Sequence, residues 1–210
     1  VAHMQGYYAL KMGKPDVQQH FAQAAAAYEA ALKLKPDYPQ VALALIELHV
    51  QFPASAGADK RQAQQLAQQL AESNEVYGAK AKSVLEPKSC DVAFWKRLLA
   101  KRPNNLDVLE ELGKAHLRQD NVEQAVKCFE KAVKQQPRRT YLFLDLSIYH
   151  SFRGLAARQD QDRLQHALTA GDAAIARYLE SQPTQPMEAY ALGVRSKYKS
   201  FAGDKQQSRE

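Results

Sequence analysis

The sequence has few of the residues and motifs that mark catalysis, metal binding or redox chemistry. It contains only two cysteines, Cys90 and Cys128, and they fit no metal-binding or redox spacing. No Gly-rich phosphate loop, GxSxG nucleophile turn or HExxH zinc motif occurs in it. We therefore expect two reduced thiols, no cofactor, no metal, and a chain that is not an enzyme.

Long apolar runs and a strong charge of one sign are also missing. No run approaches the ~20 apolar residues that a membrane helix requires. The net charge of +6 is spread along the chain, so neither half forms a basic arm. No signal peptide is recognisable, and the opening Val-Ala-His-Met is typical of a cloning remnant. The sequence therefore leaves the cellular compartment open.

What the chain does contain is helical periodicity, clearest over residues 106–139. Two amphipathic segments there are joined by a short polar turn. Asn104 or Asn105 can cap the first helix, and Asp120 or Asn121 the second. Proline at position 137 ends the second helix, because it lacks an N–H and restricts the residue before it. The pattern predicts a helical hairpin.

Small and bulky residues alternate in this hairpin at defined spacings. Small residues stand where the two helices must approach, and an aromatic ring stands between them. The positions are Leu109, Leu112-Gly113, His116, Ala125, Phe129, Ala132 and Pro137. This segment resembles a tetratricopeptide repeat (TPR), with His116 in place of the usual aromatic residue. The resemblance implies an all-α, right-handed superhelical solenoid of antiparallel helix hairpins.

Weaker copies of the pattern surround this hairpin at roughly the 34-residue period of the family. Residues 72–105 place Trp95 in the position of Phe129, and residues 5–38 repeat the alanine, aromatic, alanine and proline spacing. We predict one domain over residues 1–203 and a polar tail over 204–210. Its hairpins span about 5–38, 39–71, 72–105, 106–139 and 140–185, followed by a closing helix over 187–202.

The resemblance also implies a binding surface, because the first helix of each repeat lines the concave side in this family. The inward positions that we expect to form a partner-binding groove are Asp107, Glu110, Glu111, Lys114, Arg118, Tyr141, Asp145, Phe152, Tyr190, Lys197 and Tyr198. Such a groove is acidic in its middle and aromatic toward the C-terminus. Exposed rings beside charges suit capture of an extended or helical peptide. We therefore expect a non-catalytic adaptor with a protein or peptide partner.

One subclass of the family binds C-terminal carboxylates with basic and amide residues at inward positions. Glu110 and Glu111 occupy those positions here, and they would repel an anionic tail. Three histidines, His49, His116 and His150, occupy corresponding positions of three first helices. Neighbouring repeats hold such positions about 10 Å apart, which is too far for one zinc ion. We expect these imidazoles to pack between helices.

Two alternatives remain open. Basic residues at Lys134, Arg138, Arg139, Arg153, Arg158 and Arg163, together with Tyr141 and Phe152, could bind RNA in a basic groove with stacking rings. Interleaved acids at Asp145, Asp160 and Asp162 argue against this interpretation. In the other alternative the aromatic closing helix docks on a second copy of the chain, and the protein is an assembly subunit.

Overall fold

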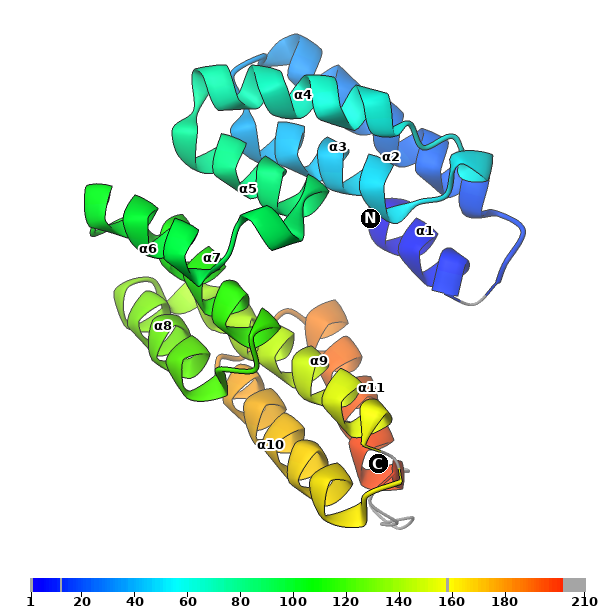
Figure 1. The fold of residues 1–210 in the computed structure, drawn as a ribbon. Helices are drawn as coiled ribbons and strands as arrows, with labels where there is room; N and C mark the ends of the chain where they lie inside the picture. The colour runs from blue at the N-terminus through cyan, green and yellow to red at the C-terminus, as the bar shows by residue number, and fades with distance from the viewer. Residues whose placement is uncertain (1, 12, 158, 202–210) are drawn as a thin grey trace. The chain divides into compact units, whose positions relative to one another are not determined.

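The computed structural model describes residues 2–11, 13–157 and 159–201, which are helical with short turns and contain no strand (Figure 1). The chain divides into two compact units, residues 1–101 and 102–210. The first unit holds α1 (Ala2–Lys11), α2 (Val17–Leu34), α3 (Pro39–Gln51), α4 (Lys60–Ser73), α5 (Glu75–Leu85) and α6 (Val92–Lys101). The all-α prediction is confirmed.

Local sequence sets the helix ends of the first unit. Pro39 begins α3 at a position where no N–H is needed. The carboxylate of Asp59 accepts hydrogen bonds from the N–H groups of Arg61 and Gln62 at the start of α4. Helix α2, which follows the turn at Pro15, has 18 residues.

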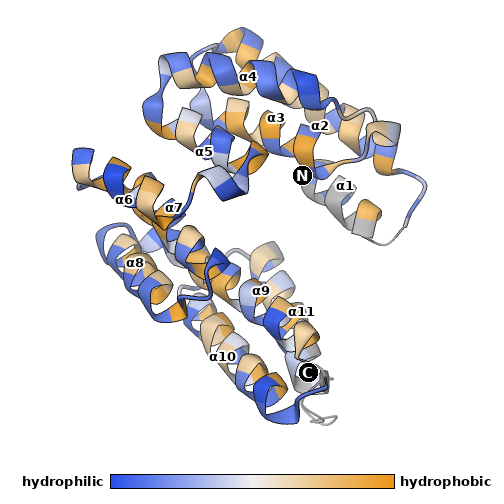
Figure 2. Cartoon of the chain, viewed as in Figure 1, coloured by the Kyte–Doolittle hydropathy of each residue, from blue (hydrophilic) through white to orange (hydrophobic). Residues whose placement is uncertain are grey.

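Helix α3 is the centre of the first unit and packs against α2, α4 and α5. It is apolar along most of its length, whereas α4 is largely hydrophilic (Figure 2). One core cluster includes Phe21, Leu48 and Phe52, and a second includes Ile46 and Leu70. The small apolar residues Ala63 and Ala67, together with Leu70, are therefore sufficient to bury one face of α4.

The second unit holds α7 (Leu106–Arg118), α8 (Val122–Gln135), α9 (Tyr141–Ala156), α10 (Gln161–Leu179) and α11 (Gln185–Phe201). Within it α7 packs on α8, α9 on α10, and α10 on α11 (Figure 1). The predicted hairpin at 106–139 and the closing helix are both present. Residues 202–210, including the predicted tail, lie outside the described part of the chain.

The α7–α8 hairpin shows why the spacing of small and bulky residues matters. Phe129 is fully buried, and its ring lies so close to Gly113 that a side chain at that position would overlap it. Ala125 and Ala132 are also fully buried. The carbonyl oxygen of the Asn105 side chain accepts a hydrogen bond from the N–H of Val108, as predicted for a cap.

The cap of α8 is at a predicted position, Asn121, but makes no side-chain capping bond. Asp120 adopts a left-handed backbone with φ of 63°, and its carboxylate instead accepts hydrogen bonds from Tyr149 and Arg153 of α9. Contacts with the next hairpin therefore determine the role of this aspartate.

Helix α11 is held to its own unit by Tyr198, which is 4% exposed. The Tyr198 hydroxyl donates to the backbone carbonyl of Ser147 and contacts the hydroxyls of Ser147 and Ser151 on α9. Its ring lies against Gly171 of α10, at a distance that leaves no room for a Cβ. The prediction that Tyr198 faces a groove is wrong, because the ring fills the space between three helices.

Four pairs of consecutive helices pack as hairpins, as the repeat pattern predicts: α1–α2, α3–α4, α7–α8 and α9–α10. In the predicted hairpin over residues 72–105, α5 packs mainly on α4 and α3 instead of on α6. The single array over residues 1–203 and its superhelical handedness stay predictions.

Candidate functional site

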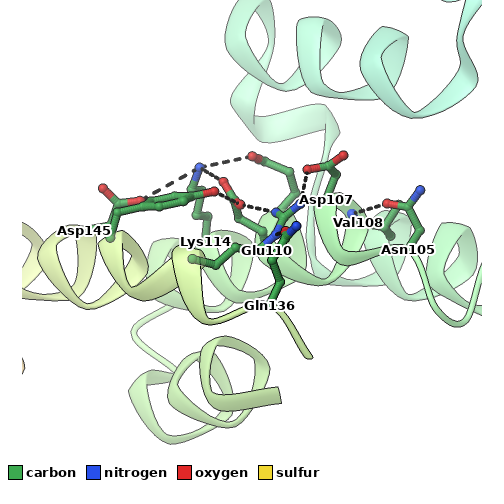
Figure 3. Close-up of polar contacts among 10 residues, drawn as sticks. Asn105, Asp107, Val108, Glu110, Lys114, Gln136 and Asp145 are labelled. Atoms are coloured by element: carbon green, nitrogen blue, oxygen red, sulfur yellow. Dashed lines mark hydrogen bonds and ion pairs between the residues drawn. The ribbon is translucent and has the colours of Figure 1, made fainter. Parts of the chain in front are cut away.

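Charged side chains converge where α7 and α9, the first helices of consecutive hairpins, face each other in the second unit (Figure 3). Asp107, Glu110, Glu111 and Lys114 share one face of α7 because their spacing follows the helical period. Arg139 comes from the 3-10 turn Pro137–Thr140. Tyr141 and Asp145 come from the first two turns of α9. We call these seven side chains the carboxylate cluster.

Glu110 is the centre of the carboxylate cluster and is only 3% exposed. Arg139 donates from Nη1 to Glu110 Oε2 at 2.8 Å and from Nη2 to Asp107 Oδ1 at 2.9 Å. The Tyr141 hydroxyl donates to Glu110 Oε2 at 2.6 Å. Lys114 Nζ donates to Glu110 Oε1 at 2.7 Å. A buried carboxylate needs this number of donors to remain ionised.

Lys114 serves three carboxylates at once. Its Nζ lies 3.2 Å from Glu111 Oε1 and 4.0 Å from Asp145 Oδ2, in addition to its bond with Glu110. Burial alone would lower the pKa of Lys114, but Glu111, Glu110 and Asp145 together raise it. Of its seven side chains, the carboxylate cluster has four acids and two cations.

Asp145 is a carboxylate of the cluster whose pKa is raised. Burial raises its pKa to about 6; Lys114 opposes this shift, and Glu110 and Glu111 reinforce it. Its side chain is nevertheless 40% exposed, so it is the most accessible of the four carboxylates to a partner. Burial and the Glu110 carboxylate likewise raise the pKa of Tyr141. The phenol therefore stays protonated and keeps donating to Glu110.

Replacing Asp145 with asparagine should stabilise the protein at neutral pH. A carboxyl whose pKa is raised on folding binds its proton more tightly in the folded state, so stability falls as pH rises from about 4 to 6. Asp145→Asn removes that loss. We expect a gain of at most about 1 kcal/mol near pH 8, because water screens a partly exposed group, and little gain near pH 4. Urea unfolding at both pH values measures it, and an equal effect at both would contradict the assignment.

A groove of about 600 Å³ continues from the carboxylate cluster along α7 and α9. Its lining consists of Lys114, Leu117, Arg118, Asp120, Asp145, Ile148, Tyr149, Phe152 and Arg153. Phe152 is 64% exposed, so its ring is accessible to a partner. We call this surface the α7–α9 groove. It offers a carboxylate at one end and an aromatic ring at the other.

Four of the eleven predicted groove residues line one groove in the structure. Lys114, Arg118, Asp145 and Phe152 line the α7–α9 groove. Glu110 and Glu111 are buried, so they hold the charges of the cluster in place and do not face a partner. Tyr190 is 45% exposed on α11 but does not line the groove. The side chain of Lys197 lies outside the described residues.

A contact between the α7–α8 turn and α9 could not be foreseen from the sequence. Tyr149 and Arg153 both donate to Asp120, about thirty positions away, and they form one wall of the α7–α9 groove. Burial, followed by the bond to Asp120, raises the pKa of Tyr149 to about 12. The local feature behind this contact is the left-handed backbone of an aspartate in a turn, and that conformation cannot be inferred from residue type.

The three histidines are buried, as predicted, with exposures of 2% for His49, 6% for His116 and 7% for His150. His49 Nδ1 accepts a hydrogen bond from the N–H of Asp59 at 3.1 Å. Within the described residues no group of three or more His, Cys, Asp and Glu side chains could hold a metal ion. Cys90 and Cys128 are both thiols. In the same part of the chain, no helix is both long and apolar enough to cross a membrane.

Comparisons with known proteins support a repeat fold. The family model described as "Tetratricopeptide repeat" matches residues 106–139. No curated protein sequence matches the chain. Among solved structures, the human IFIT1 dimer with m7Gppp-AAAA is similar, with a TM-score of 0.59 and 12% identity. The match covers 96% of this chain but 51% of that one, so the chain spans about half its length.

At this identity the likeness shows the fold alone. Combined with the family match and the packing of Phe129 on Gly113, it identifies the α7–α8 hairpin as a tetratricopeptide repeat. This chain therefore has an all-α fold that contains a tetratricopeptide repeat at residues 106–139.

Proposed function

We propose that this chain is a non-catalytic adaptor that binds an extended peptide segment of a partner protein along the α7–α9 groove. The single observation that supports this most is the exposed Phe152 in a groove that begins at the half-exposed Asp145. Repeats of this type generally serve as interaction modules, and fold alone does not name a partner. The chemistry of the groove must therefore define the occupant.

The occupant that fits is a segment that carries a lysine or arginine near an apolar residue. The four acids of the carboxylate cluster outnumber its two cations, and Asp145 lies 4.0 Å from an ammonium that it shares with two glutamates. A partner cation could pair with the exposed carboxylate of Asp145. An apolar side chain two to four positions away can then cover the Phe152 ring.

Short synthetic peptides test this function. Acetylated and amidated peptides that pair one lysine with one leucine at varied spacing should bind, and the same peptides with glutamate in place of lysine should not. Asp145→Asn should weaken the binding about tenfold, which corresponds to roughly 1.4 kcal/mol. Fluorescence anisotropy with a labelled peptide measures the dissociation constants.

The pH dependence and a matched variant make this test specific. Binding should tighten as pH rises through about 6, where Asp145 ionises. Phe152→Ala should weaken binding, whereas Leu155→Ala should not, because Leu155 is 56% exposed on the same helix but does not line the groove. Equal losses in both variants, or equal binding of the lysine and glutamate peptides, would exclude this groove as the site.

RNA binding is the second candidate, favoured by the m7Gppp-AAAA that accompanies IFIT1 in the similar structure. In this chain, two of the basic residues predicted to bind RNA already form ion pairs: Arg139 with Asp107 and Glu110, and Arg153 with Asp120. Lys134 and Arg138 are exposed, and Arg158 lies outside the described residues. Binding of a short adenylate RNA should weaken by roughly one log unit per log of salt for each phosphate contacted. No retention at low salt would exclude it.

Self-association is the third candidate, favoured because the similar IFIT1 structure is a dimer. Helix α11 exposes Met187, Tyr190 and Leu192, with 37%, 45% and 46% of their surfaces accessible. A second copy could cover these side chains. Sedimentation equilibrium at increasing protein concentration measures the mass of the species in solution. A constant monomer mass would exclude self-association.

A further inference from the structure

A second cavity lies beyond the α7–α9 groove, at the end of the α9–α10 hairpin. Helices α9 and α10 have 16 and 19 residues, whereas α7 and α8 have 13 and 14. Where the longer hairpin passes the α7–α8 turn it leaves a cavity of about 740 Å³. Its lining is Asp120, Val122, Tyr149, His150, Arg153, Ala156, Ala157, Gln159, Asp160, Asp162, Arg163, His166 and Ala167. We call it the overhang cavity.

Two histidines give the overhang cavity its unusual chemistry. His150 is 93% buried on its wall, and it makes no hydrogen bond with any other described residue. The exposed His166 lies near enough on α10 to influence its charge. Burial, followed by repulsion from His166, lowers the pKa of His150. The ring nitrogens of His150 have no hydrogen-bond partner among the described residues and are not sealed from solvent, so a ligand in the cavity could reach them.

Two arginines add donors to the same wall. Arg153 contacts Asp120 through Nη2, and Arg163 contacts Asp160 through Nε. A guanidinium has five N–H donors in a planar fork, so one ion pair leaves others available. The first-turn N–H groups of α8, which begins at the cavity residue Val122, receive no side-chain cap. Donors thus reach the cavity from α8, α9 and α10.

The three carboxylates of the cavity are largely engaged. Both oxygens of Asp120 accept hydrogen bonds, from Tyr149 and from Arg153. Asp160 caps α10 by accepting from the N–H of Arg163 and also pairs with its guanidinium. Only Asp162, exposed in the first turn of α10, makes no side-chain hydrogen bond or ion pair with another described residue. The cavity lining thus combines three carboxylates with two guanidiniums and two imidazoles.

We propose that the overhang cavity binds a phosphate-type oxyanion between His150 and His166, with the guanidinium groups of Arg153 and Arg163 as further donors. An oxyanion accepts hydrogen bonds from both imidazoles and removes the repulsion between them once they are protonated. Such a site does not depend on the peptide groove, although the two share the wall formed by Asp120, Tyr149 and Arg153.

Proton uptake by the histidines should accompany binding. The groups that face the imidazoles are Asp120 from the α7–α8 turn, Tyr149 and Arg153 from α9, and Asp160, Asp162 and Arg163 at the start of α10. Because burial and His166 lower the pKa of His150, we expect proton uptake at His150 when the oxyanion binds. Phosphate should bind about tenfold more tightly near pH 6 than near pH 8.

Histidine NMR with inorganic phosphate as the probe tests this site directly. At constant ionic strength near pH 6, phosphate should shift the imidazole signals of His150 and His166 with one dissociation constant of about 1 mM. The imidazole signals of His3 and His20 in the first unit should not shift with phosphate, and they are the internal control. The exposed Arg163→Gln variant should weaken binding about fivefold to tenfold, whereas Asp162→Asn should strengthen it.

Equal shifts at all four histidines, or shifts at His150 that Arg163→Gln leaves unchanged, would overturn the proposal. Repeating the titration with O-phosphoserine distinguishes two sources of the phosphate group: a phosphorylated side chain and free phosphate. Tighter binding of the ester supports a phosphorylated side chain as the occupant, and weaker binding supports free phosphate. Because no peptide is present, failure here would not affect the proposed peptide groove, and failure of the peptide test would not affect this site.

Discussion

Phe129→Ala should destabilise the second unit by about 3–5 kcal/mol, the usual cost of removing a fully buried aromatic ring. The ring lies directly against Gly113 and between the fully buried Ala125 and Ala132. Glycine and alanine cannot move to fill the space, since they have no side chain that could rearrange. The cavity should therefore remain largely open, and the loss should lie toward the upper end of that range.

Chemical denaturation followed by circular dichroism measures this loss. Phe152→Ala is the matched control, because it makes the same substitution in the same unit at a ring that is 64% exposed. We expect the control to change stability by no more than about 0.5 kcal/mol. Unchanged stability in Phe129→Ala would contradict the packing of the α7–α8 hairpin, and with it the repeat assignment.

Tyr198→Ala should cost a similar amount, about 3–5 kcal/mol, and should release α11 from α9 and α10. The ring fills the space beside Gly171, and its hydroxyl reaches the Ser147 carbonyl and the Ser151 hydroxyl. Removing the side chain therefore opens a cavity and leaves buried polar groups without a partner. Tyr198→Phe keeps the ring and should cost only about 1 kcal/mol.

Tyr190→Ala is the control for this prediction, since Tyr190 lies two turns earlier on the same helix and is 45% exposed. It should leave the stability nearly unchanged. Hydrogen exchange resolved by residue measures the release of α11 directly, because amides of residues 185–201 should lose protection in Tyr198→Ala alone. Equal protection in Tyr198→Ala and Tyr190→Ala would show that α11 is held by other contacts.

These two tyrosines show where reasoning from sequence reaches its limit. Both fit the inward-facing positions that the family pattern implies, and nothing local distinguishes them. Tyr198 is buried because Gly171, twenty-seven positions earlier on α10, leaves a gap of the size of its ring. Tyr190 meets no such gap. The difference depends on a contact between two helices, and helical periodicity gives no information about which glycine faces which ring.

The carboxylate cluster was predictable in part. The acids of α7 can be placed on one face from their spacing alone, and Tyr141 and Asp145 follow from the repeat period. Their roles could not be predicted, because burial depends on how closely α9 approaches α7. Glu110 is buried and saturated with donors, whereas Asp145 keeps 40% of its side chain exposed. Only the second of these carboxylates can meet a partner.

By itself the sequence determined the helices, most of their ends and the small-and-bulky contact of the α7–α8 hairpin. These depend on local forces: the 3.6-residue period of apolar side chains, the missing N–H of proline, and the size of glycine and alanine. The tertiary structure decided which charges are buried, which rings are exposed, and that the longer α9–α10 hairpin leaves a cavity lined by histidines. Those features depend on distances between segments about thirty or more positions apart, and such distances are set only when the hairpins pack together.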